Sequence, residues 1–409
     1  MVAPGFLALL LFAPATSAAG LAQPYTPHDD SAVLQHIPSS TDPRVRQFDL
    51  LRAQASAQPH DLAVAEKLSR AYIDYGRETG DARYLGRALA VIEPWLAQQP
   101  VPLSVLLLKA TILQSRHKFQ DARTILLAIL KADPDNGQAR LTLASVEQIQ
   151  GNLDAARHAC AHLMGGMDAL VAASCIGGLN AVSGHAESGY DVIQLLLTQE
   201  SPKSVTIRAW AEGLLADAAR YHGGEDQIAD AHYRAALQLA PGDNFLLATY
   251  GDFLLDQNQP QAVIDLVKNY RQSDTSFLRL VLAEAMLKLP QAAADTQEMA
   301  TRFHDLELRG DTTLYAREQA RFVLVLQHDP ARALKIAEAD WTIQRAPEDA
   351  RIYLEAALAS DTPEAAAPVL EYLDQTHLEY PRVLALAAAV RKAIAQRAAN
   401  TAAPQTTSP

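Results

Sequence analysis

The sequence of 409 residues has few cysteines, few aromatic residues and no excess of positive charge, and each shortage excludes a class of protein. Two cysteines exclude a disulfide-rich framework and a four-cysteine zinc site. Acidic residues outnumber basic residues by 47 to 35, whereas a nucleic-acid backbone requires a basic surface. We therefore expect no nucleic-acid partner. Hydrophobic residues make up 49% of the chain, which is enough to exclude a disordered protein.

Long apolar runs are also scarce, and the clearest one stands at the start of the chain. The run from Phe6 to Ala13 is too short to span a bilayer. Small residues follow it and suit a signal peptidase, although no Lys or Arg precedes Arg44. We expect residues 1–19 to be a cleaved signal peptide, with an uncleaved leader as the alternative. The mature protein would then be periplasmic or secreted, without a stable membrane anchor, and would begin with a flexible segment, residues 20–41.

An internal repeat of about 34 residues dominates the middle of the chain, between Leu103 and Leu170. Each copy has an apolar run that ends in a small residue, Ala110 in the first and Ala144 in the second. A second apolar stripe follows, and Pro134 closes the first copy. This order predicts two antiparallel helices that cross at small residues, with a helix breaker between the units.

This pattern resembles the tetratricopeptide repeat family, specifically its exported bacterial members, over roughly residues 61–380. The resemblance implies an all-α fold, a right-handed superhelical solenoid of antiparallel helix pairs, whose concave face is lined by the first helix of each pair. We expect this solenoid to cover residues 42–397, with its clearest repeats at 103–170 and 204–273. A closing helix is expected at 381–396 and a disordered tail at 398–409.

Three segments depart from the regular repeat. Residues 76–84 and 221–225 carry extra residues, which we interpret as enlarged turns. Residues 171–200 form a unit rich in glycine. The tryptophans at 95, 210 and 341 stand at spacings typical of repeat cores.

The resemblance also implies which residues line the groove. They are neutral and contain no basic clamp for a terminal carboxylate, so they favour a neutral or extended partner segment. The candidates are Ser104, Leu107, Thr111 and Gln114 in the first copy and Gln138, Leu141, Ser145 and Gln148 in the second.

Two pairs of residues could carry chemistry. Cys160 and Cys175 lie at similar distances from the turn between their predicted helices, so they could form a disulfide or fill the core as two small side chains. His158 and His162 share one helix face, a spacing that suits a metal, but no third ligand is evident. A solvated pair is the simpler interpretation.

No phosphate-binding loop, nucleophile elbow or cysteine metal motif occurs in the sequence, so we expect neither enzymatic activity nor a cofactor. The first hypothesis is a non-catalytic scaffold of the bacterial cell envelope that binds a protein or peptide along the concave groove. The alternative is a periplasmic small-molecule or metal-binding protein that uses the face of His158 and His162. Self-association through the C-terminal repeats is a structural variant of the first hypothesis.

Overall fold

The computed structural model describes residue 29 and residues 43–199, 204–310 and 313–402. The chain divides into two compact units, Met1–Gln47 and Phe48–Pro409, and apart from the first residues of the first helix everything below concerns the second. The expected signal peptide lies outside the described residues, as does the expected flexible segment except for residue 29. Within the described ranges, no helix is long and apolar enough to cross a membrane.

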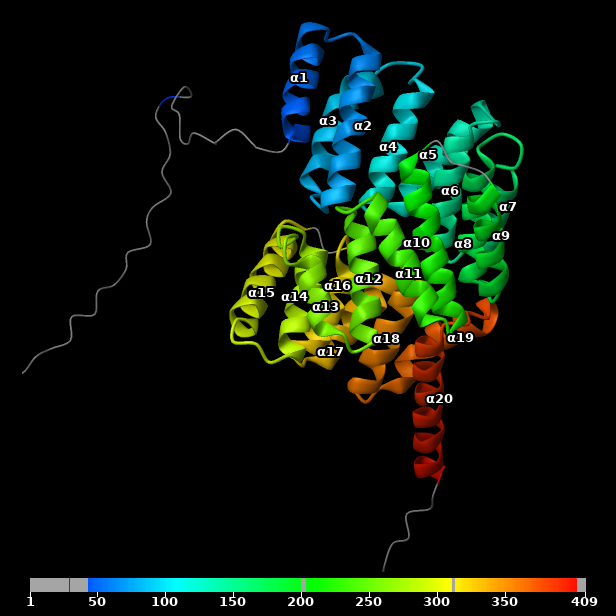
Figure 1. Cartoon of the computed structure of the whole chain (residues 1–409), viewed down its shortest axis with the longest axis vertical. Coiled ribbons are helices and arrows are strands. Elements are labelled where there is room, and N and C mark those ends of the chain that lie inside the picture. Colours follow the sequence, from blue (N-terminus) through cyan, green and yellow to red (C-terminus); the bar gives the residue numbers. More distant parts are fainter. Residues whose placement is uncertain (1–28, 30–42, 200–203, 311–312, 403–409) are drawn as a thin grey trace, which may run out of the picture. The chain divides into compact units, whose positions relative to one another are not determined.

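The described residues form helices joined by turns and contain no β-strand (Figure 1). Successive helices form antiparallel pairs, as the repeat pattern predicts. In chain order, after α1 (Pro43–Ala57), the pairs are α2 (Leu62–Thr79) with α3 (Arg83–Leu96), α4 (Leu103–Ser115) with α5 (Phe119–Ala132), α6 (Gly137–Ile149) with α7 (Leu153–Ala161), α8 (Ala169–Ala181) with α9 (Ala186–Gln199), α10 (Val205–His222) with α11 (Asp226–Leu239), α12 (Asn244–Asp256) with α13 (Pro260–Val267), α14 (Asp274–Met286) with α15 (Ala292–Leu308), and α16 (Ala316–Val325) with α17 (Pro330–Trp341). The chain ends with α18 (Pro347–Ala359), the 3-10 helix η1 (Pro363–Ala366), α19 (Ala367–Thr376) and α20 (Pro381–Ala402).

Small residues and caps explain why the pairs form where they do. Ala110 and Ala122 are fully buried between α4 and α5, and Ala144 is buried in the next pair, so the helices can approach closely at these positions. The side chain of Asn136 accepts a hydrogen bond from the backbone at the start of α6, and that of Asp243 does so at the start of α12. The predicted crossing points are therefore the observed ones.

The glycine-rich unit is a close helix crossing. A Cβ atom built on Gly177 of α8 would lie 2.6 Å from the carbonyl oxygen of Gly189 in α9. Only glycine at both positions lets the two backbones come so near. The glycines are therefore packing residues.

The prediction of enlarged turns at residues 76–84 and 221–225 is wrong. The first helices α2 and α10 have 18 residues, whereas α4, α6 and α8 have 13, so the extra residues lengthen helices. Gly80, in the left-handed conformation, ends α2, and Gly223 follows α10. Each of these two glycines has a positive φ, 71° and 85°, which ends the helix at that point.

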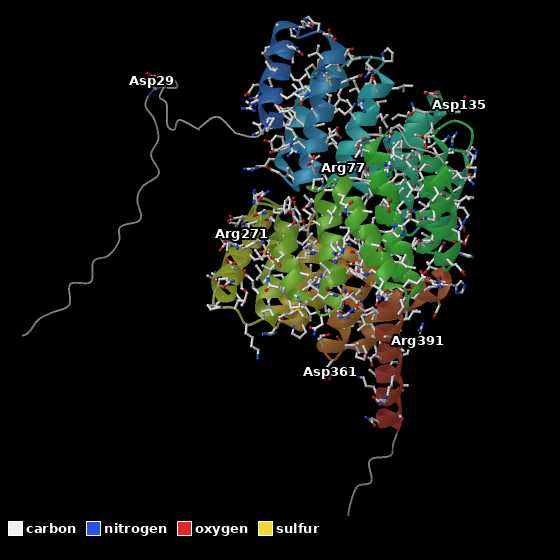
Figure 2. All side chains as sticks on the ribbon, in the orientation of Figure 1. Asp29, Arg77, Asp135, Arg271, Asp361 and Arg391 are labelled. Carbon is white, nitrogen blue, oxygen red and sulfur yellow. A yellow bond between two sulfur atoms is a disulfide. The ribbon has the colours of Figure 1, made fainter. Side chains whose placement is uncertain are left out.

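The prediction that the closing helix ends at residue 396 is also wrong. Helix α20 continues to Ala402, so residues 398–402 belong to a helix, and 403–409 lie outside the described residues. The segment after Ile394 is rich in alanine, and Arg397 forms ion pairs with Asp361 and Glu364. Exposed charged side chains such as Asp135 and Arg391 project outward from the helices (Figure 2).

Candidate functional site

The predicted groove residues occupy the same face of two neighbouring first helices. Counted from the N-cap residue, they stand at positions 2, 5, 9 and 12 of α4, which follows Pro102, and of α6, which follows Asn136. Gln138 is exposed and the other seven side chains are half-buried. The structure thus places all eight candidates on the equivalent faces of adjacent repeats.

These side chains differ in what they offer a partner. The hydroxyl of Thr111 donates to the carbonyl oxygen of Leu107 at 2.9 Å, and that of Ser145 donates to Leu141 at 3.2 Å, so both are already occupied within their own helices. The side-chain amides of Gln114 and Gln148 make no hydrogen bond to any described residue. The two amides stand at the same position of successive repeats, half-buried and with their donors and acceptors unused.

The same face of the C-terminal helices α12 and α18 carries charged residues. Position 9 of α12 is Asp252, and positions 2 and 5 of α18 are Glu348 and Arg351. Together with residues of α10, α14 and α16 they form what we call the buried ion cluster. Its buried members are Arg220, Asp252, Arg279, Arg321 and Arg351, and its half-buried members are Asp256 and Glu348.

Ion pairs in this cluster join helices that are far apart in the sequence. Arg279 binds Asp252 at 2.7 Å, and Arg321 also contacts this carboxylate. Arg351 binds Asp256 at 2.8 Å across the interior. Although burial opposes ionisation, the two guanidinium groups around Asp252 hold its pKa well below the usual range. Position 9 of α12 and positions 2 and 5 of α18 are therefore occupied by ion pairs within the chain.

Later repeats also contact the ends of earlier ones. The hydroxyl of Tyr315 donates to the carbonyl oxygen of Gly80 at 2.9 Å, and the carboxylate of Glu379 accepts from the backbone N–H of Ala186 at 3.0 Å. The backbone N–H of Arg345 donates to Ile149 at 2.7 Å. These contacts link one edge of α2, α6 and α9 to the C-terminal part, and the groove face of α4 and α6 keeps its unpaired amides.

The geometry that decides the fold is this regular series of helix pairs whose equivalent positions line one inner face. The chain is an all-α solenoid of helical repeats. No family model matches the sequence, and no curated protein matches it.

Several solved structures are similar to the solenoid. One is a chain of the APC/C hetero-tetramer Cut9–Hcn1, with a TM-score of 0.41 and 15% identity over 86% of this chain and 52% of that one, so the solenoid spans about half of that chain's length. Another is human IFIT1 in its dimer with m7Gppp-AAAA, with a TM-score of 0.45 and 12% identity over 86% of both chains. A third is a tetratricopeptide repeat protein from Parabacteroides merdae, with a TM-score of 0.30 and 13% identity over 85% of the solenoid and 99% of that chain.

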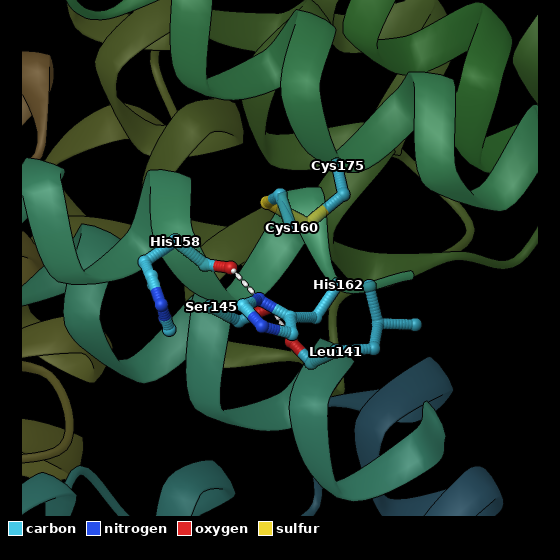
Figure 3. The surroundings of a disulfide bond; sticks show 6 residues. All are labelled: Leu141, Ser145, His158, Cys160, His162 and Cys175. Atoms are coloured by element: carbon cyan, nitrogen blue, oxygen red, sulfur yellow. Dashed lines mark hydrogen bonds between the residues drawn. A yellow bond between two sulfur atoms is a disulfide. The ribbon is translucent and has the colours of Figure 1, made fainter. Parts of the chain in front are cut away.

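The two histidines of the alternative hypothesis lie on the outer side of the solenoid. His158 and His162 are exposed, and their ring centroids are 4.3 Å apart. The Nδ1 atom of His162 is 2.8 Å from the carbonyl oxygen of His158 (Figure 3). Among the described residues, no group of three or more histidines, cysteines and carboxylates could hold a metal ion. The histidine pair therefore offers two ligands without a third.

The two cysteines form a disulfide in the structure. Cys160 of α7 and Cys175 of α8 have their Cα atoms 5.6 Å apart and their sulfur atoms 2.03 Å apart (Figure 3). Both are buried. The bond joins two consecutive repeats of the solenoid beside the groove helix α6, whose Leu141 and Ser145 lie close to it in the same view.

The tryptophans divide between two environments. Trp95 and Trp341 are buried, and Trp341 packs edge-on against Tyr372, with ring centroids 5.3 Å apart. Trp210 is only half-buried on α10, so the expectation of a core position is wrong for this residue.

Sequence analysis missed two hollows and the buried ion cluster. A cavity of about 180 Å³ lies between Phe303 and Phe322, but Glu307 at its wall is already paired with Arg332 at 3.0 Å. A shallower hollow of about 580 Å³ lies beside Met286. The cluster did have a signal, since charged residues stand at groove positions of otherwise apolar helices. Its pairing partners depend on the curvature of the solenoid, which no local pattern gives.

Proposed function

We propose that this protein is a non-catalytic scaffold that holds an extended, uncharged segment of a protein partner on the inner face of α4 and α6. The observation that carries the proposal is the pair of unused amides of Gln114 and Gln148, one per repeat, on a neutral and half-buried face. Amides can both donate to and accept from a peptide backbone, and they carry no charge that would select a charged tail.

The buried ion cluster supports the same location for the site. Charged groups stand at position 9 of α12 and at positions 2 and 5 of α18, and they pair with one another or with neighbouring helices. A partner at those positions would have to replace desolvated ion pairs, which is costly. Binding is therefore favoured at the N-terminal repeats, where the groove residues are neutral.

We place the scaffold outside the cytoplasm, in the bacterial cell envelope. The apolar leader of the sequence favours export. A buried disulfide is consistent with it, because such bonds persist in oxidising compartments. Sequencing the N-terminus of the mature protein tests this location; an intact Met1 in the cytoplasmic fraction would contradict it.

Photo-cross-linking in cells tests the binding surface. A photoreactive amino acid is introduced at Gln114, at Gln148, or at the control position Gln120, an exposed glutamine on α5, the second helix of the same pair as α4. We expect the two groove positions to capture the same partner and the control position not to capture it. Equal capture at all three positions, or none at the groove positions, would refute the surface.

A further inference from the structure

The connection between α17 and α18, residues 342–346, packs against the N-terminal repeat helices α4, α5 and α6. The side chain of Ile343 packs against the apolar cluster of α4, α5 and α6. Gln344 is buried. The backbone N–H of Arg345 donates at 2.7 Å to Ile149, the last residue of α6. The connection therefore docks on the groove helix directly beside Gln148.

The docked connection fits the turn after α6 tightly. A Cβ atom built on Gly151 would lie 3.0 Å from Cδ of Arg345 and 3.0 Å from Cε2 of Tyr372. Gly151 also has a positive φ of 80°, which favours glycine. Small movements of the connection are thus transmitted to the end of α6, because no space separates the two segments.

Gln344 is held between two carboxyl groups. Its Nε2 atom lies 3.0 Å from Oδ1 of Asp340 and 3.3 Å from Oδ1 of Asp349. Asp349 also accepts from the backbone N–H of Ala346 at 2.7 Å and from Arg317 at 3.3 Å. Asp340, in contrast, contacts no cation within ion-pair distance among the described residues, although only 2% of it is exposed.

The charges that face Asp340 come from both neighbouring helices. Helix α18 contributes Asp349, and α16 contributes Arg317 and Glu318. Two further carboxylates thus share the one guanidinium group of Arg317 with Asp340. Burial, and then the charge of Asp349, raises the pKa of Asp340 to about 8. Burial also raises the pKa of Asp349, which Arg317 partly offsets.

We propose that residues 342–346 are a pH-sensitive latch on α6. The latch is closed while the carboxyl group of Asp340 is protonated, and ionisation of this group releases it. The latch would regulate the groove, so this inference rests on the proposed function of α4 and α6. Release follows from geometry: Gln344 covers both carboxyl oxygens of Asp340, so outward movement of the connection removes this cover and lets water reach the ionised carboxylate on α17.

The direction of the pH dependence is fixed by linkage. The closed latch binds the proton of Asp340 more tightly than the open latch, in which the pKa returns toward its ordinary value. The ratio of open to closed latch should therefore rise with pH, by up to about tenfold per pH unit between about pH 4 and about pH 8, and level off above that.

Hydrogen–deuterium exchange of the full chain, followed by mass spectrometry, measures this ratio without any partner. Peptides that cover residues 342–352 and 144–152 are compared from about pH 5 to about pH 9, after correction for the pH dependence of chemical exchange. The wild-type chain should show exchange in both segments that accelerates with pH. The Asp340→Asn variant keeps the shape of the protonated carboxyl and should show a much smaller acceleration, because only Asp349, whose pKa burial also raises, still titrates beside Gln344. Asp361→Asn, at an exposed position, should behave like the wild type.

A second variant keeps the test decisive if Asp340→Asn does not fold. Asp349→Asn removes the neighbouring negative charge, so the acceleration should end at a lower pH than in the wild type. Exchange that is independent of pH in the wild type, or the same slope in Asp340→Asn, overturns the latch. Acceleration confined to residues 342–352, with no change in 144–152, overturns its coupling to the groove. None of these results depends on the cross-linking at Gln114, so a failure of the latch and a failure of the binding surface remain distinguishable.

Discussion

Gly177 of α8 and Gly189 of α9 lie against each other where the two helices cross, with the backbone of each occupying the place that a side chain on the other would need. The contact fixes the spacing of the repeat that carries Cys175 and that follows the groove helix α6. The glycine-rich middle of the chain is thus a closely packed repeat.

We expect Gly177→Ala to destabilise the protein by about 1–3 kcal/mol, because the new methyl group meets the carbonyl oxygen of Gly189 at 2.6 Å. The matched control is Gly86→Ala in α3, where an added Cβ meets nothing within 4 Å. That substitution should stabilise the helix by about 0.5–1 kcal/mol. Urea unfolding of the two variants measures both changes. A Gly177→Ala protein as stable as the wild type would mean that α8 and α9 are not in close contact.

The repeat pattern predicted α4 to α7 well because its signals are local. Ala110, Ala122 and Ala144 are small wherever helices must cross, and that requirement is visible in the sequence. The length of α2 and α10 was not predictable in the same way, because extra residues can extend a helix or enlarge a turn and only the position of the glycine distinguishes the two.

The groove residues illustrate a different limit. Their common face follows from helical spacing, and the structure places them on it. Whether the equivalent face of α12 and α18 is open depends on contacts between residues about a hundred positions apart, such as Asp256 and Arg351. Such contacts are set by the accumulated curvature of the repeats, to which every helix crossing contributes.

Asp252→Asn should lower the free energy of unfolding by about 3–5 kcal/mol, because it removes the buried carboxylate that Arg279 and Arg321 share and leaves Arg279 with Glu318 alone. The control is Asp265→Asn, which removes an exposed carboxylate paired with Lys268 and should leave stability unchanged. Urea unfolding at constant pH and salt measures both variants. Equal stability of the two would show that the cluster is solvated and that the C-terminal groove face is open.

Reduction of the disulfide should destabilise the chain. The bond between Cys160 and Cys175 closes a loop of 15 residues, which corresponds to about 3 kcal/mol. The melting temperature of the wild type should therefore fall when a thiol reductant is added, and that of the Cys160→Ala/Cys175→Ala variant should not respond. Alkylation after the reductant is added shows whether both thiols are free. If they are free and the melting temperature of the wild type is unchanged, the prediction is wrong.

The free energy of unfolding of the whole chain should also depend on the protonation of Asp340. Its folded-state pKa of about 8 lies above the ordinary value of 3.8, so the folded state binds the proton more tightly than the unfolded state. The stability of the wild type relative to Asp340→Asn should thus fall by up to about 1.4 kcal/mol per pH unit as the pH rises from about 4 to about 8, and change little above that. Thermal melts of both proteins across this pH range supply the comparison. A stability difference that does not change with pH would mean that the carboxyl group of Asp340 is solvated in the folded state.

The last prediction concerns the proposed binding surface on α4 and α6. Replacing Gln114 and Gln148 together by alanine removes two unpaired amides and leaves the helices intact, because alanine has the highest helix propensity. If each amide contributes one neutral hydrogen bond of about 1 kcal/mol to the partner, the double variant should bind the cross-linked partner about 30-fold more weakly. Its melting temperature should stay at or slightly above that of the wild type.

Gln120→Ala supplies the control for this measurement, because Gln120 is an exposed glutamine on the second helix of the same pair. Titration calorimetry with the purified partner should give the wild-type affinity for this variant and the weakened affinity for the double variant. An unchanged affinity in the double variant would remove the amides from the site. The apolar side chains of Leu107 and Leu141, half-buried on the same face, would then be the next residues to replace, since they are the remaining groove groups without a polar role.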